Sequence, residues 1–101
     1  MLFLIRHTHS PERCPGAKGP EAGKKFMASV SEDAAAKAGV KVVGSYIAPT
    51  EHMLLFVVDA KDLKSVEAFT FGKLALVGNT KITPVMRMKE AAAALPKFVK
   101  K

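Results

Sequence analysis

A short segment near the start of the sequence, residues 6–16, holds side chains that can bind a metal ion or take part in acid–base and nucleophilic chemistry. It contains two of the three histidines, the only cysteine and a glutamate, which are His7, His9, Cys14 and Glu12. Imidazole nitrogens and a thiolate are donors that zinc, iron and copper accept, whereas magnesium and calcium prefer oxygen. The segment therefore predicts a mononuclear transition-metal site for Zn, Fe or Cu.

The spacing of the two histidines fits a β-strand over residues 1–9. In such a strand His7 and His9 share one face with Phe3 and Ile5, because side chains alternate between the two faces. Residues two apart on a strand have Cα atoms about 6–7 Å apart and point the same way, so two imidazoles can reach one ion. Proline and glycine residues over 10–20 predict that a loop follows the strand.

Hydrophobic periodicity and turn residues divide the rest of the chain. The pattern predicts a helix over 21–38 with a possible new start at Ser31, strands over 40–48 and 52–59 joined by a hairpin, a helix from Asp62 to Gly78, and a last strand over 79–89 in which Pro84 favours an edge position. Residues 90–101 are alanine-rich and basic, and are expected to form a short helix or a frayed tail. We expect a single domain over 1–101, with its core in 1–89.

This order of elements predicts an α+β protein with the ferredoxin-like arrangement βαββαβ. Right-handed crossovers then give a four-stranded antiparallel sheet in the spatial order fourth, first, third, second strand, with two helices on one face. Because the first and third strands are apolar on both sides, the face without helices would be an exposed apolar patch. We therefore expect a homodimer in which two sheets pack against each other.

The element order, the doubly apolar strands and the segment Ile82-Thr83-Pro84-Val85 resemble the dimeric α+β barrel superfamily of small ferredoxin-like proteins. The resemblance covers residues 1–89. That superfamily includes cofactor-free monooxygenases, stress-responsive barrels, haem-binding enzymes and lactone isomerases. The resemblance implies a fold and a dimer but no particular reaction. The His-x-His stretch followed by a cysteine lies outside the pattern of the common members.

The expected fold brings the third histidine to the first two. In an antiparallel pair the end of the first strand lies beside the start of the third, so His52 is expected next to His7 and His9. Cys14 lies in the loop that leaves the same edge. We predict all four as metal ligands, although a one-residue change of register would turn His52 to the other face. If three of them bind, the fourth position is open for water, substrate or O₂.

The catalytic candidates are Cys14, Glu12 and Glu51. A glutamate at this edge could act as a general base or as a partner of a ligating imidazole. The favoured function is a metal-dependent enzyme acting on a small organic molecule by oxygenase-, hydratase- or isomerase-type chemistry. One alternative is a metal-binding or carrier module without turnover. A further alternative is a metal-free enzyme, either cofactor-free and monooxygenase-like or with a Cys14 nucleophile activated by His7 or His9.

Composition narrows the partners and the compartment. With 49% hydrophobic and 25% charged residues the chain is typical of a folded protein, and its longest apolar runs are too short to cross a bilayer, so no membrane partner is expected. One cysteine excludes an internal disulfide and fits a reducing, cytoplasmic location. The net charge of +7 is scattered, and the strand over 52–59 lacks the basic and aromatic pattern that stacks bases, so no specific nucleic-acid partner is expected.

Overall fold

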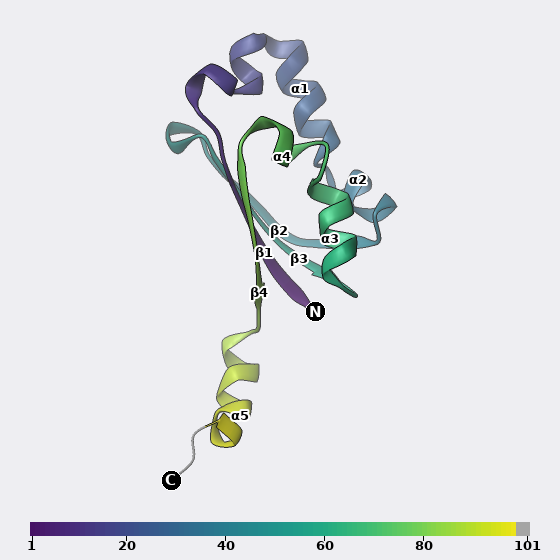
Figure 1. The fold of residues 1–101 in the computed structure, drawn as a ribbon, viewed down its shortest axis with the longest axis vertical. Helices are drawn as coiled ribbons and strands as arrows, with labels where there is room; N and C mark the ends of the chain where they lie inside the picture. The colour runs from purple at the N-terminus through teal and green to yellow at the C-terminus, as the bar shows by residue number, and fades with distance from the viewer. Residues whose placement is uncertain (99–101) are drawn as a thin grey trace.

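Four strands form one antiparallel sheet in the computed structural model, which describes residues 1–98 (Figure 1). The strands are β1 (Leu2–Thr8), β2 (Val40–Ala48), β3 (Met53–Ala60) and β4 (Asn79–Val85). Their order across the sheet is β2-β3-β1-β4, which is the neighbour order expected from the sequence. β4 is an edge strand with a neighbouring strand on one side only. Proline, which has no N–H to donate to a second neighbour, is tolerated in such a strand, as Pro84 is here.

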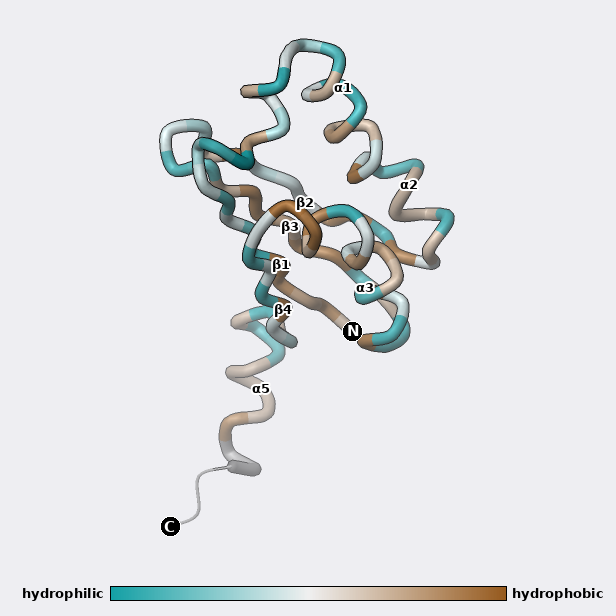
Figure 2. Tube along the Cα trace, turned by 45° about the horizontal axis from the view of Figure 1, so that its top comes forward, coloured by the Kyte–Doolittle hydropathy of each residue, from teal (hydrophilic) through white to brown (hydrophobic). Residues whose placement is uncertain are grey.

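Helices cover one face of this sheet (Figures 1 and 2): α1 (Pro20–Ser29), α2 (Glu32–Lys37), α3 (Leu63–Thr70) and α4 (Leu74–Val77). Alternation along β1 puts Phe3 and Ile5 fully beneath the helices and leaves Leu4 half-buried on the other face. The alternation predicted from the sequence is thus confirmed. The buried hydrophobic core consists of Phe3, Ile5, Val30, Ala35, Val40, Leu54, Phe56, Val58, Ala60, Val66, Phe69 and Leu74.

Capping residues explain where the helices begin. The Ser31 hydroxyl accepts a hydrogen bond from the backbone N–H of Ala34 at 3.2 Å, so the expected first helix is two helices, α1 and α2. Asp62 caps α3 as expected, because its Oδ1 accepts from the Ser65 N–H at 2.9 Å. The single helix expected between Asp62 and Gly78 is wrong, since Gly72 adopts a φ of +78° and separates α3 from α4.

Short turns shape the connections on either side of the expected site. The loop after β1 contains two 3-10 turns, η1 (Pro11–Arg13) and η2 (Pro15–Lys18). A third turn, η3 (Pro49–Glu51), makes the expected tight connection between β2 and β3. These three turns lie at one end of the sheet, where β1 ends and β3 begins.

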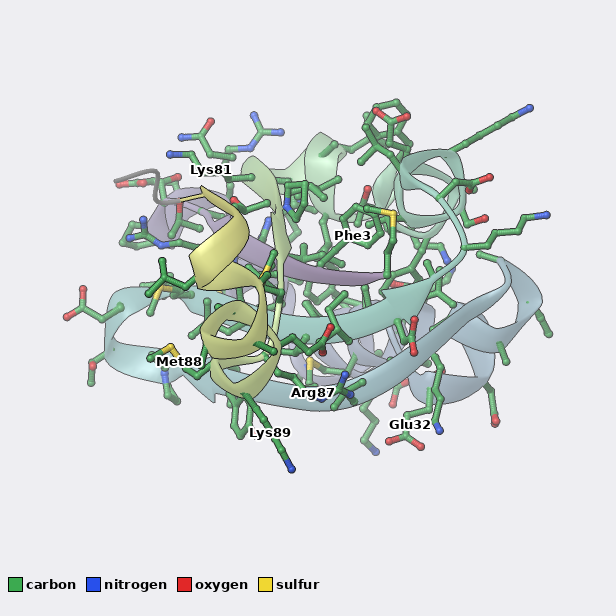
Figure 3. All side chains as sticks on the ribbon, turned by 90° about the horizontal axis from the view of Figure 1, so that it is seen from below. Phe3, Glu32, Lys81, Arg87, Met88 and Lys89 are labelled. Carbon is green, nitrogen blue, oxygen red and sulfur yellow. The ribbon has the colours of Figure 1, made fainter. Side chains whose placement is uncertain are left out.

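The last strand is shorter than expected. β4 ends at Val85, and a further helix, α5 (Met88–Phe98), runs away from the sheet (Figure 1). Figure 3 shows Lys89 at the start of α5 pointing away from the rest of the protein. The tail expected over 90–101 is therefore helical to Phe98, and residues 99–101 lie outside the described residues. No helix in the described part of the chain has the length and apolarity needed to cross a membrane.

Candidate metal centre

The end of β1 and the start of β3 bring two histidines together. Thr8 pairs with Met53 in the antiparallel register, so His9 and His52 form the next pair beyond the strands. The backbone N–H of His9 donates to the carbonyl oxygen of His52 at 3.2 Å. The ring centroids of the two histidines are 5.4 Å apart in an edge-to-face arrangement. The expected meeting of these two histidines is confirmed.

Cys14 completes a group of three donors with His9 and His52. One ligand atom from each of the three lies within 4.8 Å of the other two, and all three residues are half-buried. Around a tetrahedral ion such donor atoms are roughly 3.3–3.7 Å apart, so side-chain movements of about 1 Å bring them into place. The described residues therefore include a ready set of two imidazoles and one thiol, compatible with binding a transition metal.

His7 is not part of this group. Its ring is fully buried, with Nδ1 3.3 Å from the Thr80 hydroxyl and Nε2 2.9 Å from Nδ1 of His9. Both ring nitrogens of His7 are thus engaged, and ligation by His7 as predicted from the sequence would require one of these contacts to break. The contact with His7 also leaves Nε2 of His9 as the nitrogen available to an ion.

The electrostatics of the cluster favour neutral imidazoles. Burial lowers the pKa of His7 to about 4, and the neighbouring His9 adds to the shift. Burial and the nearby His52 likewise lower the pKa of His9. Neutral imidazole is the form that binds metal ions, so the desolvation of this end of the sheet prepares His9 as a ligand at neutral pH.

His52 has an unusual backbone conformation. With φ 48° and ψ 46° it is the only non-glycine residue at positive φ among those that the structure describes. It follows η3 directly, and its N–H donates to the carbonyl oxygen of Pro49 at 3.2 Å. Left-handed backbone at a residue other than glycine costs free energy and is concentrated at functional positions. The turn thus places the His52 ring beside the ring of His9.

Arg13 fixes the loop that carries Cys14. Its Nε donates to the carbonyl oxygen of Val77 at 2.9 Å, and its Nη2 donates to that of Leu76 at 2.7 Å. These are carbonyls at the end of α4, a helix terminus that lacks partners of its own. This role could not be predicted from a local pattern, because Arg13 and Val77 are 64 positions apart.

Gly78 has a second role besides ending α4. A Cβ added at this position would collide with the carbonyl oxygen of Thr8 and would lie 2.8 Å from Cβ of His9. The backbone of Gly78 is extended, so the requirement for glycine comes from this close approach and not from its dihedral angles. Only the absence of a side chain lets the start of β4 pack against His9.

A cavity of about 400 Å³ lies beside the three donors, on the helix-covered side of the sheet. His9, Cys14 and His52 all line it. The rest of its wall is apolar and comes from η2, α1, β2 and β3, including Pro15, Phe26, Met27, Ile47, Met53 and Leu54. No described residue in this wall is an Asp, Glu, Lys or Arg.

The two glutamates expected near the site lie on its outside. Glu12 in η1 and Glu51 in η3 are exposed, and neither lines the cavity. Their catalytic roles stay predictions.

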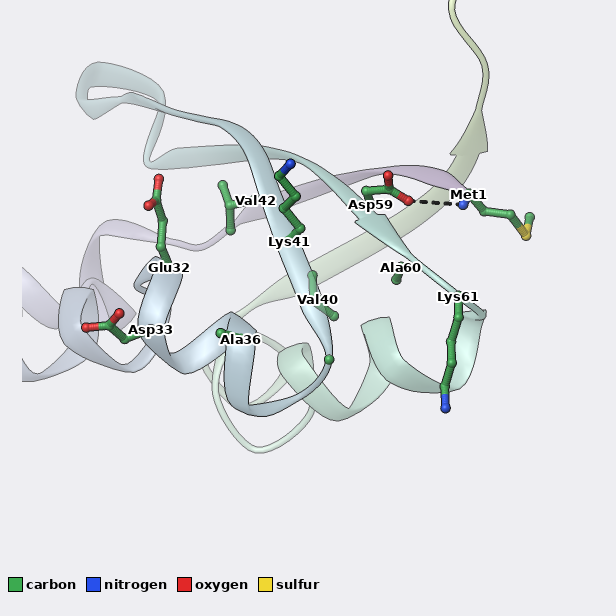
Figure 4. A pocket seen from close by; sticks show the side chains of 11 residues that line it. Met1, Glu32, Asp33, Ala36, Val40, Lys41, Val42, Asp59, Ala60 and Lys61 are labelled. Atoms are coloured by element: carbon green, nitrogen blue, oxygen red, sulfur yellow. Dashed lines mark hydrogen bonds and ion pairs between the residues drawn. The ribbon is translucent and has the colours of Figure 1, made fainter.

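A larger hollow of about 770 Å³ lies at the opposite end of the sheet, where β1 begins (Figure 4). Charged groups of both signs surround it: Glu32, Asp33, Lys41, Lys61 and Asp59, the last of which pairs with the N-terminal amino group at 3.1 Å. Neither histidine nor cysteine is among the described residues in its lining. The side chains that can bind a transition metal are therefore concentrated at the other end.

Comparison with known proteins gives a family without an assigned function. The family described as "Domain of unknown function (DUF3303)" matches residues 1–99 of the chain. No curated protein matches the chain.

Proposed function

We propose a metal-dependent function for this chain, which belongs to the DUF3303 family: His9, Cys14 and His52 hold a transition-metal ion at the mouth of an apolar cavity. The observation that carries the proposal is the coincidence of the three donors with the wall of that cavity. Three protein ligands leave the fourth position of a tetrahedral ion to water or substrate, which is the arrangement of catalytic sites. The chain is then an enzyme acting on a small organic molecule, with zinc, iron or copper as its ion.

Each residue has a distinct part in this proposal. His9 and His52 supply neutral nitrogens, and Cys14 supplies a thiolate whose negative charge the ion stabilises. His7 is an orienting partner of His9, because it contacts Nδ1 of His9 and is itself held by Thr80. Held by these residues, the ion would supply Lewis acidity for hydratase- or isomerase-type chemistry, and iron or copper would supply the redox chemistry of an oxygenase.

Metal retention tests the proposal. Protein stripped with a chelator and loaded with Co²⁺ should keep about one ion per chain after desalting, with the near-ultraviolet absorption of a cobalt–thiolate bond. Cys14→Ser should lose that absorption, and His52→Asn, which tolerates the left-handed backbone, should lose most of the metal. Glu21→Gln, exposed on α1 and outside the cavity wall, is the control and should retain it. No retention by the unmodified protein, or equal retention in all three variants, would refute the site.

The response of bound Co²⁺ to small anions separates an enzyme from a carrier. An open fourth position admits added azide, so the visible spectrum should change. A spectrum that does not change indicates a filled, closed site and favours the metal-binding or carrier module without turnover.

A metal-free candidate rests on the same geometry. The thiol of Cys14 lies within 4.8 Å of a nitrogen of His9 and of His52, close enough for an imidazole to take its proton after a small movement. An activated thiolate predicts that iodoacetamide modifies Cys14 rapidly at neutral pH and that His9→Ala or His52→Asn slows the reaction. An ordinary thiol rate in metal-free protein would exclude this candidate.

For the assembly we propose a ferredoxin-like domain over residues 1–101, related to the dimeric α+β barrel superfamily and dimerising through the open sheet face. Leu4, Leu55 and Val57 are half-buried on this face, and Tyr46 lies over Gly44 at its edge. Leu55→Lys should convert a dimer to a monomer in light-scattering measurements, whereas Lys64→Ala, at an exposed position of α3, should not. A monomeric unmodified protein would refute the dimer. A reducing compartment such as the cytoplasm suits the free thiol of Cys14.

A further inference from the structure

The wall of the cavity beside the metal donors is apolar almost throughout. Two glycines and the side chains of Pro15, Phe26 and Met27 come from η2 and α1 above the sheet, and the strands supply Ile47, Met53 and Leu54. Gly16 and Gly23 face each other across η2 and α1, so that a Cβ on Gly23 would lie 3.5 Å from Cα of Gly16. The absence of side chains at these two positions lets η2 lie close against α1 in this part of the wall.

The absence of charge in the described wall restricts what can bind. A carboxylate or phosphate placed in the cavity away from the ion would lose its hydration without gaining an Arg or Lys partner. An uncharged hydrocarbon portion, in contrast, gains from leaving water. The one strongly polar feature is the trio of donors, so a ligand needs polarity only at the end that faces them.

Volume and side-chain type set the size of the ligand. About 400 Å³ lies at the small end of the range for ligand pockets, and suits a single ring with a short substituent. Two of the wall residues, Met27 and Met53, are unbranched and can adjust to ligands of different outline. Met27 is half-exposed, which places it at the entrance.

We propose that this site takes an uncharged, mainly apolar small molecule that presents a single neutral or ionisable donor atom to the metal position. The inference rests on the proposed function, because the donor atom needs the ion. It adds the chemical class of the substrate: aromatic or alicyclic compounds with one hydroxyl, carbonyl or amine group, as distinct from phosphorylated or dicarboxylic metabolites.

Binding of three probes to the Co²⁺-loaded protein tests the class. Imidazole reports the open coordination position alone, 4-phenylimidazole adds an apolar ring, and 4-(4-carboxyphenyl)imidazole adds a charge to that ring. Followed by visible absorption, 4-phenylimidazole should bind at least about tenfold more tightly than imidazole, and the carboxylate should cancel this gain.

A matched pair of variants assigns the gain to the cavity. Met27→Lys introduces a cation at the entrance and should reduce the preference for 4-phenylimidazole and restore binding of the carboxylate probe. Met86→Lys changes an equally exposed methionine outside the cavity and should leave all three affinities unchanged. Elemental analysis of each protein before titration shows whether the ion is retained.

The outcomes distinguish the two levels of the proposal. If no Co²⁺ is retained, the metal site itself is refuted. If Co²⁺ is retained and imidazole binds, but 4-phenylimidazole binds no more tightly, the metal site stands and the apolar class is overturned. Equal binding of 4-phenylimidazole to metal-free and metal-loaded protein overturns the coordination of the donor atom.

Discussion

The two ends of the sheet carry hollows of opposite chemistry. Where β1 begins, a hollow of about 770 Å³ is bordered by charged groups of both signs. Where β1 ends, a cavity about half that size is bordered by apolar side chains and by two imidazoles and a thiol that are compatible with metal binding. The larger hollow holds groups that water solvates well, whereas the smaller one holds groups that have been partly withdrawn from water.

This difference shows that the side chains that line a cavity, more than its volume, indicate whether it is a candidate binding site. Charges near solvent interact weakly, because water screens them and long side chains lose entropy when they pair. Neutral imidazoles and a thiol cost less free energy to bury than charged groups, and they are donors that a transition-metal ion accepts once the thiol has lost its proton. Four experiments test this contrast.

Acid should destabilise the donor end through His7. Because the pKa of folded His7 is about 4 and that of an unfolded histidine about 6.5, the unfolded chain binds more protons between these values. The free energy of unfolding of metal-free protein should therefore be fully present above pH 6.5 and fall by about 3 kcal/mol as the pH drops to 4. Urea unfolding at several pH values, with chelator present, measures this.

His7→Gln is the control for the pH experiment. It keeps a polar side chain against Thr80 but cannot titrate, so most of the pH dependence between 6.5 and 4 should vanish. A smaller part remains through His9, whose pKa is also lowered. The same steep dependence in the variant would show that His7 is not the group responsible.

Replacing one glycine at each end of the sheet compares the two ends directly. Gly78→Ala forces a Cβ against Thr8 and His9, and should cost about 2–3 kcal/mol of stability and weaken Co²⁺ retention. Gly39→Ala, beside the charged hollow, meets no atom within 4 Å and suffers only from its φ of +78°, at about 1 kcal/mol. Thermal unfolding and elemental analysis of both variants give the comparison. Equal metal loss in the two would contradict the placing of His9 by Gly78.

Arg13→Gln tests the loop that carries Cys14. Losing the hydrogen bonds to the carbonyls of Leu76 and Val77 should loosen this loop and weaken Co²⁺ binding about tenfold, as removal of a ligand's supporting contact does. Arg87→Gln, whose partner is Glu90 on α5, is the control and should bind the metal normally. Unchanged affinity in Arg13→Gln would show that the loop is held by other contacts.

The smallest effect is expected at the charged end. Asp59→Asn breaks an ion pair with the N-terminal amino group. The side chain of Met1 is 61% exposed and that of Asp59 is 50% exposed, so water screens this pair. The free energy of unfolding should change by less than about 1 kcal/mol, and less still in high salt. Metal retention should not change. A large loss of either would mean that this end also organises the protein.

Local signals in the sequence predicted much of the fold. Apolar residues bounded by turn residues located all four strands, and β2 has the predicted bounds. The Asp62 cap and the helix end at Gly78 followed from residue type. The break between α3 and α4 was missed, because the apolar periodicity continues across Gly72 and gives no sign that the backbone reverses there.

The site was predictable only as far as strand pairing determines it. Antiparallel register brings His9 to His52, and that was foreseen. The role of His7 depends on Thr80, its partner in the register between β1 and β4, and a count of histidines cannot show that two of them bond to each other. Arg13 and Gly78 act on residues more than 60 positions away, so no local pattern reveals them.

The left-handed backbone of His52 sets stability against function. Glycine or asparagine at this position would relax the turn and raise the melting temperature, yet would remove an imidazole from the end of the sheet. A library screened for heat resistance alone would accordingly discard His52, and only a second screen for metal retention would recover it.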